Sequence, residues 1–173
     1  MPTLRVVTPV AAPRARVFDL ARSIDLHRLS TAGTEEEAIA GRTTGLIGYG
    51  EEVTWRARHF GVRQTLTARV TGFNRPFHFT DEMVTGAFAS FTHLHAFEEA
   101  PRGTVMVDTF TYTAPLGPLG RLAERLVLNR YLTKLLTERN AVIKAYAESD
   151  RWREVPGLGG HDAGPGGERG GVR

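Results

Sequence analysis

The stretch ASFTHLHAFEEAPRGTVMVDTFTYTA, residues 89–114, predicts two neighbouring strands joined by a short loop at 98–103. A period of two places alternate side chains of a strand on the same face. In each half, the residues of one face are aromatic, apolar or titratable: Phe91, His93, His95 and Phe97, then Met106, Asp108, Phe110 and Tyr112. Because aromatic residues flank the titratable ones, we expect this face to point into the protein.

The register of this hairpin decides which histidine faces Asp108. In one register, Phe97 lies opposite Thr104. That register places His93 opposite Asp108, and a shift of two residues places His95 there instead. Directly opposed side chains have their β carbons about 5 Å apart. Either register therefore brings a histidine within hydrogen-bonding reach of Asp108.

Alternation continues upstream of the hairpin. In EEVTWRARHF, residues 51–60, Val53 and Trp55 share one face while Arg56 and Arg58 share the other. Gly61 allows a tight reversal into the next alternating run. Further strands are predicted in three segments, at 35–40, 62–70 and 76–84. The pattern is typical of an antiparallel sheet with one covered face and one solvated, basic face.

Helical spacing appears only near the two ends of the chain. A first strand at 3–8 is followed by two short helical segments, at about 13–22 and 25–29. From Pro118 to Glu148 the chain contains no further proline and, after Gly120, no glycine, and an apolar stripe at spacings of three and four includes Leu128, Tyr131, Leu132 and Leu135. A helix of that length spans about 40–45 Å. It needs a large apolar surface, and the covered face of the sheet is the candidate.

Length and composition indicate one folded domain at residues 1–148 and a tail at 149–173. The tail contains GLGGHDAGPGGERGGVR, residues 157–173, which is rich in glycine and poor in bulky apolar side chains. Such a segment buries too little surface to offset its ordering entropy, so we expect it to be disordered.

Charge and cysteine content exclude several classes of function. The formal net charge is +3, and the arginines are spread among acidic and aliphatic residues, so a nucleic-acid partner is not expected. The absence of cysteine excludes disulfides, thiolate metal sites and a cysteine nucleophile. Residues 1–20 lack the apolar core of a signal peptide, and no stretch has the length of a transmembrane helix. We expect a cytoplasmic protein without stable membrane insertion; its oligomeric state is not indicated.

Three stretches carry a family resemblance: GEEVTWRARHFG at 50–61, FTDEMVTGAFASFTHLHAF at 79–97 and DTFTYTAPLGPLGRLA at 108–123. With the order of elements, they resemble the START-like helix-grip superfamily (SRPBCC), and most closely its small bacterial polyketide cyclase/dehydrase-like or ligand-binding members. The resemblance implies an α+β helix-grip fold. A curved antiparallel sheet of about seven strands would wrap around the long C-terminal helix, with two short helices after the first strand and a cavity between sheet and helix.

A ligand site in such a cavity would combine apolar walls with a few placed polar groups. The helix would act as a lid through its apolar stripe. The expected ligand-binding residues are Trp55, Phe91, His93, His95, Phe97, Asp108, Phe110, Tyr112 and Tyr131. The predicted function is binding of a small hydrophobic or amphipathic molecule, with no cofactor and no metal.

The histidine–aspartate pair leaves several alternatives open. It could be a structural pair, could orient a ligand together with Tyr112, or could act as a general base in a cyclase or dehydratase with Tyr112 as acid or oxyanion partner. Two histidines at i and i+2 can also chelate a metal, with Asp108 as third ligand. A protein-interaction module with a collapsed cavity is a further alternative.

Two other titratable residues have less definite predicted places. Asp81 shares a face with Phe79 and Met83, and the pattern permits either a strand-end acid or an inward polar group. His27 falls in a helical segment, where we expect it to face solvent.

Overall fold

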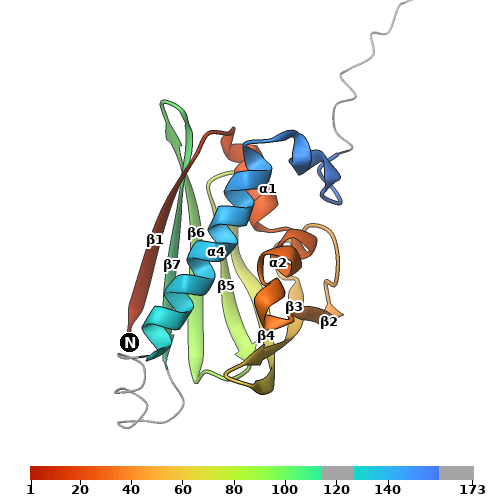
Figure 1. Cartoon of the computed structure of the whole chain (residues 1–173), viewed down its shortest axis with the longest axis vertical. Helices are drawn as coiled ribbons and strands as arrows, with labels where there is room; N and C mark the ends of the chain where they lie inside the picture. Colours follow the sequence, from red (N-terminus) through yellow and green to blue (C-terminus); the bar gives the residue numbers. More distant parts are fainter. Residues whose placement is uncertain (114–126, 160–173) are drawn as a thin grey trace, which may run out of the picture.

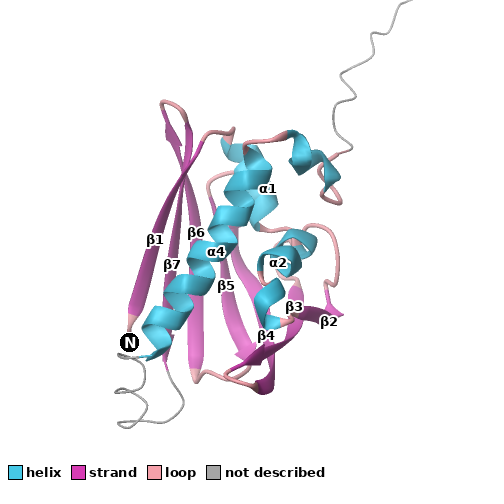
Figure 2. Cartoon of the chain, in the orientation of Figure 1, coloured by secondary structure: helices cyan, strands magenta, loops and turns pink. Residues whose placement is uncertain are grey.

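In the computed structural model, residues 1–113 and 127–159 are described, and an antiparallel sheet of seven strands carries the helices on one face (Figures 1 and 2). The strands are β1 (Thr3–Val10), β2 (Glu37–Gly41), β3 (Glu52–His59), β4 (Val62–Asn74), β5 (His78–Thr85), β6 (Ser90–Ala100) and β7 (Gly103–Thr113). The helices are α1 (Arg14–Ala21), α2 (Ile24–Ser30), α4 (Asn129–Ala147) and the short 3-10 helices η1 (Ala32–Thr34) and η3 (Asp150–Glu154).

The strand order is β1-β7-β6-β5-β4-β3-β2, so the first strand lies beside the last and the others form a meander. Hairpins join neighbours, as short connections in an antiparallel sheet require. The β6–β7 hairpin turns at Pro101 and Arg102, since Ala100 pairs with Gly103. Gly103 has φ +135°, and a β carbon there would lie 2.3 Å from the backbone oxygen of Val10. Only glycine fits this turn without moving the neighbouring chain.

The sheet is curved because two of its strands contain register shifts. In β4 the pairing with β5 shifts between Thr67 and Ala68 and again between Val70 and Gly72. A further shift occurs in β2. Such bulges bend a strand and increase its twist. The long strands thus form a trough, and α4 crosses it diagonally in Figure 1.

The two faces of the sheet differ in polarity as the alternation predicts. Val53 and Trp55 of β3 are buried beneath the helices, while Arg56 and Arg58 of the same strand are exposed. Figure 2 shows the helices gathered on the covered face. The predicted α+β helix-grip architecture, with two short helices after the first strand, is confirmed.

The main core lies under α1. The Phe18 ring makes edge contacts with three phenylalanines of the sheet, at centroid distances of 5.3–5.5 Å: Phe73, Phe79 and Phe97. The C-terminal half of α4 joins this core through Ile143, which is 2% exposed. The N-terminal half is only partly buried through Leu132 and Leu136. The space under that half of the helix is therefore not filled by close packing.

The predicted long helix is described only in part, and the first residues of the predicted tail pack on the core. The predicted helix from Pro118 begins in the segment 114–126, which lies outside the described residues; its described part is α4. The predicted tail starts at 149, yet Trp152, Val155 and Leu158 contact the core, and Val155 is 4% exposed. These three apolar side chains at a spacing of three extend the packed part of the chain past residue 148. Residues 160–173 lie outside the described part.

None of the described helices is both long enough and apolar enough to span a bilayer. α4 has 19 residues, among them the buried Arg139 and Asn140. Its polar buried face is suited to the interior of this fold, where side chains of the sheet supply partners.

Candidate functional site

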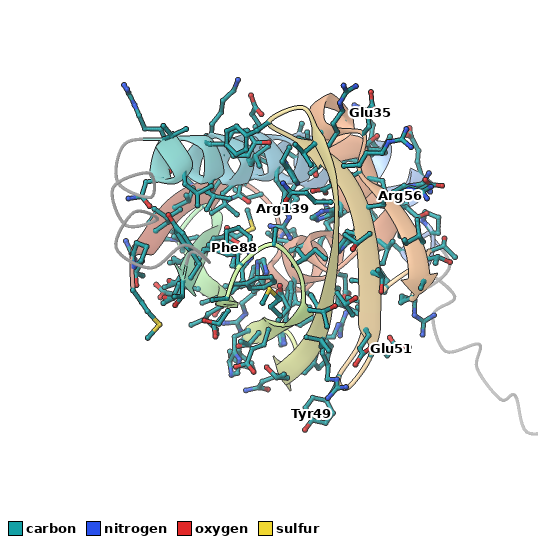
Figure 3. The ribbon with its side chains drawn as sticks, turned by 90° about the horizontal axis from the view of Figure 1, so that it is seen from below. Glu35, Tyr49, Glu51, Arg56, Phe88 and Arg139 are labelled. Atoms are coloured by element: carbon teal, nitrogen blue, oxygen red, sulfur yellow. The ribbon has the colours of Figure 1, made fainter. Side chains whose placement is uncertain are left out.

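A cavity of about 340 Å³ lies between the sheet and the N-terminal half of α4. Most of its wall is apolar, and a few titratable side chains interrupt it. Figure 3 shows Phe88 and Arg139 in the interior between α4 and the strands, whereas Tyr49 and Glu51 lie at the periphery. The volume falls in the range of small-molecule sites, about 300–1,000 Å³.

The structure places six of the nine predicted ligand-binding residues in the cavity wall. They are Trp55, Phe91, His93, His95, Phe110 and Tyr131. The predicted lid residues Leu128, Leu132 and Leu135 lie there too. The sequence pattern thus located the part of the wall that β6 and β7 contribute, because alternate residues of these strands point toward the helix; that these residues bind a ligand stays a prediction.

Three predicted site residues lie elsewhere. Phe97 lies farther along β6 and packs on Phe18 in the main core. Tyr112 is fully buried, and its hydroxyl donates to Oδ1 of Asn129 at 2.8 Å. Asp108 is also fully buried, behind the histidines rather than in the wall. The strand period fixes a face, but it does not show where along the strand the hollow ends.

Four titratable side chains on three adjacent strands form what we call the histidine–aspartate cluster: Asp81, His93, His95 and Asp108. His93 Nε2 donates to Asp108 Oδ1 at 3.1 Å, and His95 Nε2 donates to Asp81 Oδ1 at 3.0 Å. His95 Nδ1 lies 2.7 Å from Asp108 Oδ1, at an angle outside hydrogen-bonding range. Both histidines therefore share one carboxylate.

Strand register assembles this cluster. His95 lies opposite Asp108 on β7, while His93 lies opposite Asp81 on β5. Of the two predicted registers, the one shifted by two residues is therefore correct, and the tight turn between Ala100 and Gly103 is the reason. The imidazoles of His93 and His95 lie 3.8 Å apart, centroid to centroid. Asp81 is the inward polar group of the two alternatives left open by the sequence.

The long helix completes the cluster from the other side. Asn140 Nδ2 donates to Asp108 Oδ2 at 2.7 Å. Arg139 Nη1 lies 3.6 Å from Asp108 Oδ1, and Nη2 of the same guanidinium donates to the Ala21 oxygen at 2.7 Å. Helix and sheet are thus joined through one buried carboxylate, which satisfies the rule that buried charges are paired.

Two opposing effects set the pKa values in the cluster. Burial disfavours the charged form of each group, and contact with an oppositely charged neighbour favours it. Burial favours a raised pKa for Asp108, but the hydrogen bond from His93 and the close contact with His95 prevail and hold its pKa well below the ordinary value. For His95, burial lowers the pKa, and the close contacts with the Asp108 and Asp81 carboxylates outweigh it, so the net shift is upward. The pKa of His93 is lowered, by burial first and by the neighbouring His95 second.

A second polar group lies in another part of the cavity wall. It consists of His27, Glu36, His59 and Tyr131, and we call it the Glu36 cluster. Glu36 Oε2 accepts from His27 Nε2 at 2.7 Å, and Glu36 Oε1 lies 3.9 Å from His59 Nε2. His59 Nδ1 is hydrogen-bonded to the Tyr131 hydroxyl at 2.7 Å. The His27 ring stacks on Trp55 at 4.3 Å. The expectation that His27 faces solvent was wrong, because α2 turns this side chain toward β3.

The Glu36 carboxyl is held in its charged form. Burial raises the pKa of Glu36, but the attraction and hydrogen bond of His27 outweigh it and lower the pKa overall. Burial together with the Glu36 charge raises the pKa of Tyr131, which keeps its hydroxyl protonated. Trp55 on β3 is three strands from His93 on β6, or about 14 Å along the sheet. The cavity therefore has two separate polar patches with apolar wall between them.

Sequence reasoning missed several of these groups. Arg139 follows Leu132, Leu135 and Leu136 on the same helical stripe, and a charged residue on an apolar stripe is a detectable signal. The Glu36 cluster had no comparable signal, because its members come from α2, the residue before β2, β3 and α4. Only the folded arrangement brings them together.

The comparisons with known proteins agree with this geometry. The sequence model of the family described as polyketide cyclase / dehydrase and lipid transport matches residues 1–148. The chain belongs to this family. It lies within the SRPBCC superfamily, so the START-like resemblance is confirmed. No curated protein matches the sequence.

Solved structures show the same fold at low sequence identity. The protein TTHA0849 from Thermus thermophilus is 21% identical, with a TM-score of 0.67, covering 84% of this chain and 99% of that one. Major latex-like protein 151 from Panax ginseng is 13% identical, with a TM-score of 0.60, covering 86% and 98%. The di-domain ARO/CYC StfQ from the steffimycin biosynthetic pathway is 14% identical, with a TM-score of 0.68, covering 84% and 50%. At these identities the likeness shows the fold alone.

Proposed function

We propose that this protein binds one small amphipathic molecule in the cavity between α4 and the sheet. The observation that supports this proposal is a cavity of about 340 Å³ whose apolar wall is interrupted by two polar patches. Side chains that line a hollow have no protein packing contacts on that side. An apolar ligand body would restore those contacts, and polar ends would meet the patches.

The wall offers aromatic surface on opposite sides of the hollow. Trp55 stands on β3, Phe91 of β6 and Phe110 of β7 stack on each other at 5.2 Å, and α4 contributes Tyr131. Aromatic side chains present large rigid contact areas and favour flat apolar ligands. The His93 imidazole and Arg139 guanidinium in the same wall supply hydrogen-bond donors and acceptors for an oxygen-bearing group.

The rival functions fit the geometry less well. A collapsed interaction module does not account for the volume of the hollow. The cyclase or dehydratase arrangement that the sequence suggested needs Tyr112 beside the His–Asp pair in the cavity. The Tyr112 hydroxyl instead donates to Asn129, and Tyr112 is absent from the described cavity wall. A ligand-binding role requires no such third group.

The proposal is tested by titration with 1-anilinonaphthalene-8-sulfonate, a small amphipathic dye whose emission rises in apolar surroundings. We expect saturable binding with one dye per chain. Leu132→Trp, which fills the cavity from α4, should weaken dye binding at least about tenfold, or about 1.4 kcal/mol. Lys134→Trp is the matched control, because the Lys134 side chain is 72% exposed on the same helix.

Thermal unfolding of both variants shows whether the fold is kept. Absence of saturable binding, or equal affinity in wild type and Leu132→Trp when both are folded, would overturn the proposal. Equal weakening by Lys134→Trp would show that the dye binds the surface of the helix instead.

A further inference from the structure

We propose that Asp81, His93 and His95 bind one divalent transition-metal ion in the wall of the cavity. A ligand-capable atom of each lies within 4.8 Å of those of the other two. Both histidines are at least nine-tenths buried, and Asp81 is half-buried beside them. These two imidazoles and one carboxylate also lie in the wall that we propose meets the organic ligand, so the metal is tested without dye and the dye is tested on chelator-stripped protein.

Close contact with Asp108 takes one nitrogen of each histidine, and we assign the other nitrogen to the ion. His93 directs Nε2 to Asp108, which leaves Nδ1. His95 directs Nδ1 toward Asp108, which leaves Nε2, and this atom lies 3.0 Å from Asp81 Oδ1. Two ligand atoms bound to one ion at about 2.1 Å are roughly 3.4 Å apart in a tetrahedral site. The pair of His95 Nε2 and Asp81 Oδ1 would have to open by roughly 0.4 Å to hold an ion between them.

Asp108 has the place and partners of a group that supports metal ligands from behind. It contacts both imidazoles through Oδ1, at 3.1 Å from His93 and 2.7 Å from His95. Its other oxygen accepts from Asn140 at 2.7 Å, which fixes the carboxylate. Histidine ligands in metal sites characteristically turn their second nitrogen to such a carboxylate. Asp108 therefore acts behind the ligands, and Asp81 is the third ligand.

Charge and ligand type define the class of ion. The cluster holds the carboxylates of Asp81 and Asp108, and the Arg139 guanidinium lies 3.6 Å from Asp108. With both imidazoles neutral, as metal ligation requires, two negative charges against one positive leave a formal excess of one negative charge in the described cluster. Imidazole ligands suit Zn²⁺, Co²⁺, Ni²⁺ and Fe²⁺, whereas Mg²⁺ and Ca²⁺ prefer sites made of oxygen alone. Three protein ligands leave coordination positions open, and these would face the cavity.

The test uses the tag-free full-length protein, stripped with a chelator and titrated with Co²⁺ alone by calorimetry and visible absorption. We expect one equivalent bound with a Kd of about 10 μM or tighter, and d–d bands in the visible range. Zn²⁺ should displace the cobalt and abolish the bands. Binding weaker than about 1 mM, or no visible bands in the bound form, would overturn the proposal.

Substitutions of the proposed ligands test which side chains bind the ion. Asp81→Asn and His95→Gln should each weaken Co²⁺ binding at least about 30-fold. His78→Gln is the matched control, because His78 stands on β5 with Asp81 but outside the described cavity wall, and it should bind as wild type does. If His95→Gln does not fold, Asp81→Asn decides, since the Asp81 side chain is 23% exposed and more tolerant of change. Unchanged affinity in folded Asp81→Asn would overturn the assignment.

Discussion

Asp108→Asn removes one buried negative charge while keeping the size of the side chain. In the wild type, the Asp108 carboxylate is contacted by His93, His95 and Asn140, with the Arg139 guanidinium 3.6 Å away. Breaking a buried charge network by removing one partner costs about 3–5 kcal/mol. The asparagine can still bond to some of the same neighbours, so we expect the lower end, about 3 kcal/mol.

Urea unfolding followed by circular dichroism measures this loss. For a domain of this size the free energy of unfolding falls by about 2 kcal/mol per molar urea. The midpoint should therefore move down by about 1.5 M in Asp108→Asn. Metal must be removed by a chelator beforehand, so that any bound ion does not add to the stability of the wild type.

Asp150→Asn is the matched control, since it makes the same chemical change where the side chain is 96% exposed. Its free energy of unfolding should stay within about 0.5 kcal/mol of the wild-type value. If Asp108→Asn also stayed within that range, Asp108 would not be the charged centre that joins α4 to the histidines.

Three further outcomes are expected. The pKa of Glu36 is lowered below its ordinary value of 4.5, so its carboxylate stabilises the fold above that pH, and this stabilisation is lost as the pH falls through the folded-state pKa. Glu36→Gln should therefore lower the free energy of unfolding by about 1.5 kcal/mol at pH 7. The difference in melting temperature between the variant and the wild type should shrink as the pH is lowered. A gap that widens toward acid would contradict this sign. Gly103→Ala should lower the free energy of unfolding by at least about 2 kcal/mol in the same urea assay. Gly33→Ala, where an added β carbon meets nothing within 4 Å, should leave it nearly unchanged. Phe97→Leu should lower the free energy of unfolding by about 1–1.5 kcal/mol and leave the affinity for the dye unchanged, because Phe97 packs in the main core. A loss of dye binding in the folded variant would show that Phe97 belongs to the ligand site.

The fold was predictable because its determinants are periodic and local. Alternation on β3 and β6 identified the covered face, and the apolar stripe before residue 148 identified the helix that lies on it. Gly61 and the β6–β7 loop marked reversals of the chain. Such signals depend on residues that are close together in the sequence, so a single sequence is enough to detect them.

The site was only partly predictable, for two physical reasons. A period of two cannot distinguish registers that differ by two residues, so the partner of Asp108 depended on the length of the turn, which the chain closes with Pro101 and Arg102 alone. The Glu36 cluster depends on contacts between segments far apart in sequence, so that His27 on α2 meets Trp55 on β3. Periodicity carries no information about such contacts.

The hollow between α4 and the sheet is most directly tested by a crystal structure of the protein with 1-anilinonaphthalene-8-sulfonate bound. The dye should lie under the N-terminal half of α4, with its rings against Trp55, Phe91 and Leu132 and its sulfonate toward Arg139. A dye bound only on the outer face, with the side chains of α4 closed onto the sheet and no space between them, would contradict the account.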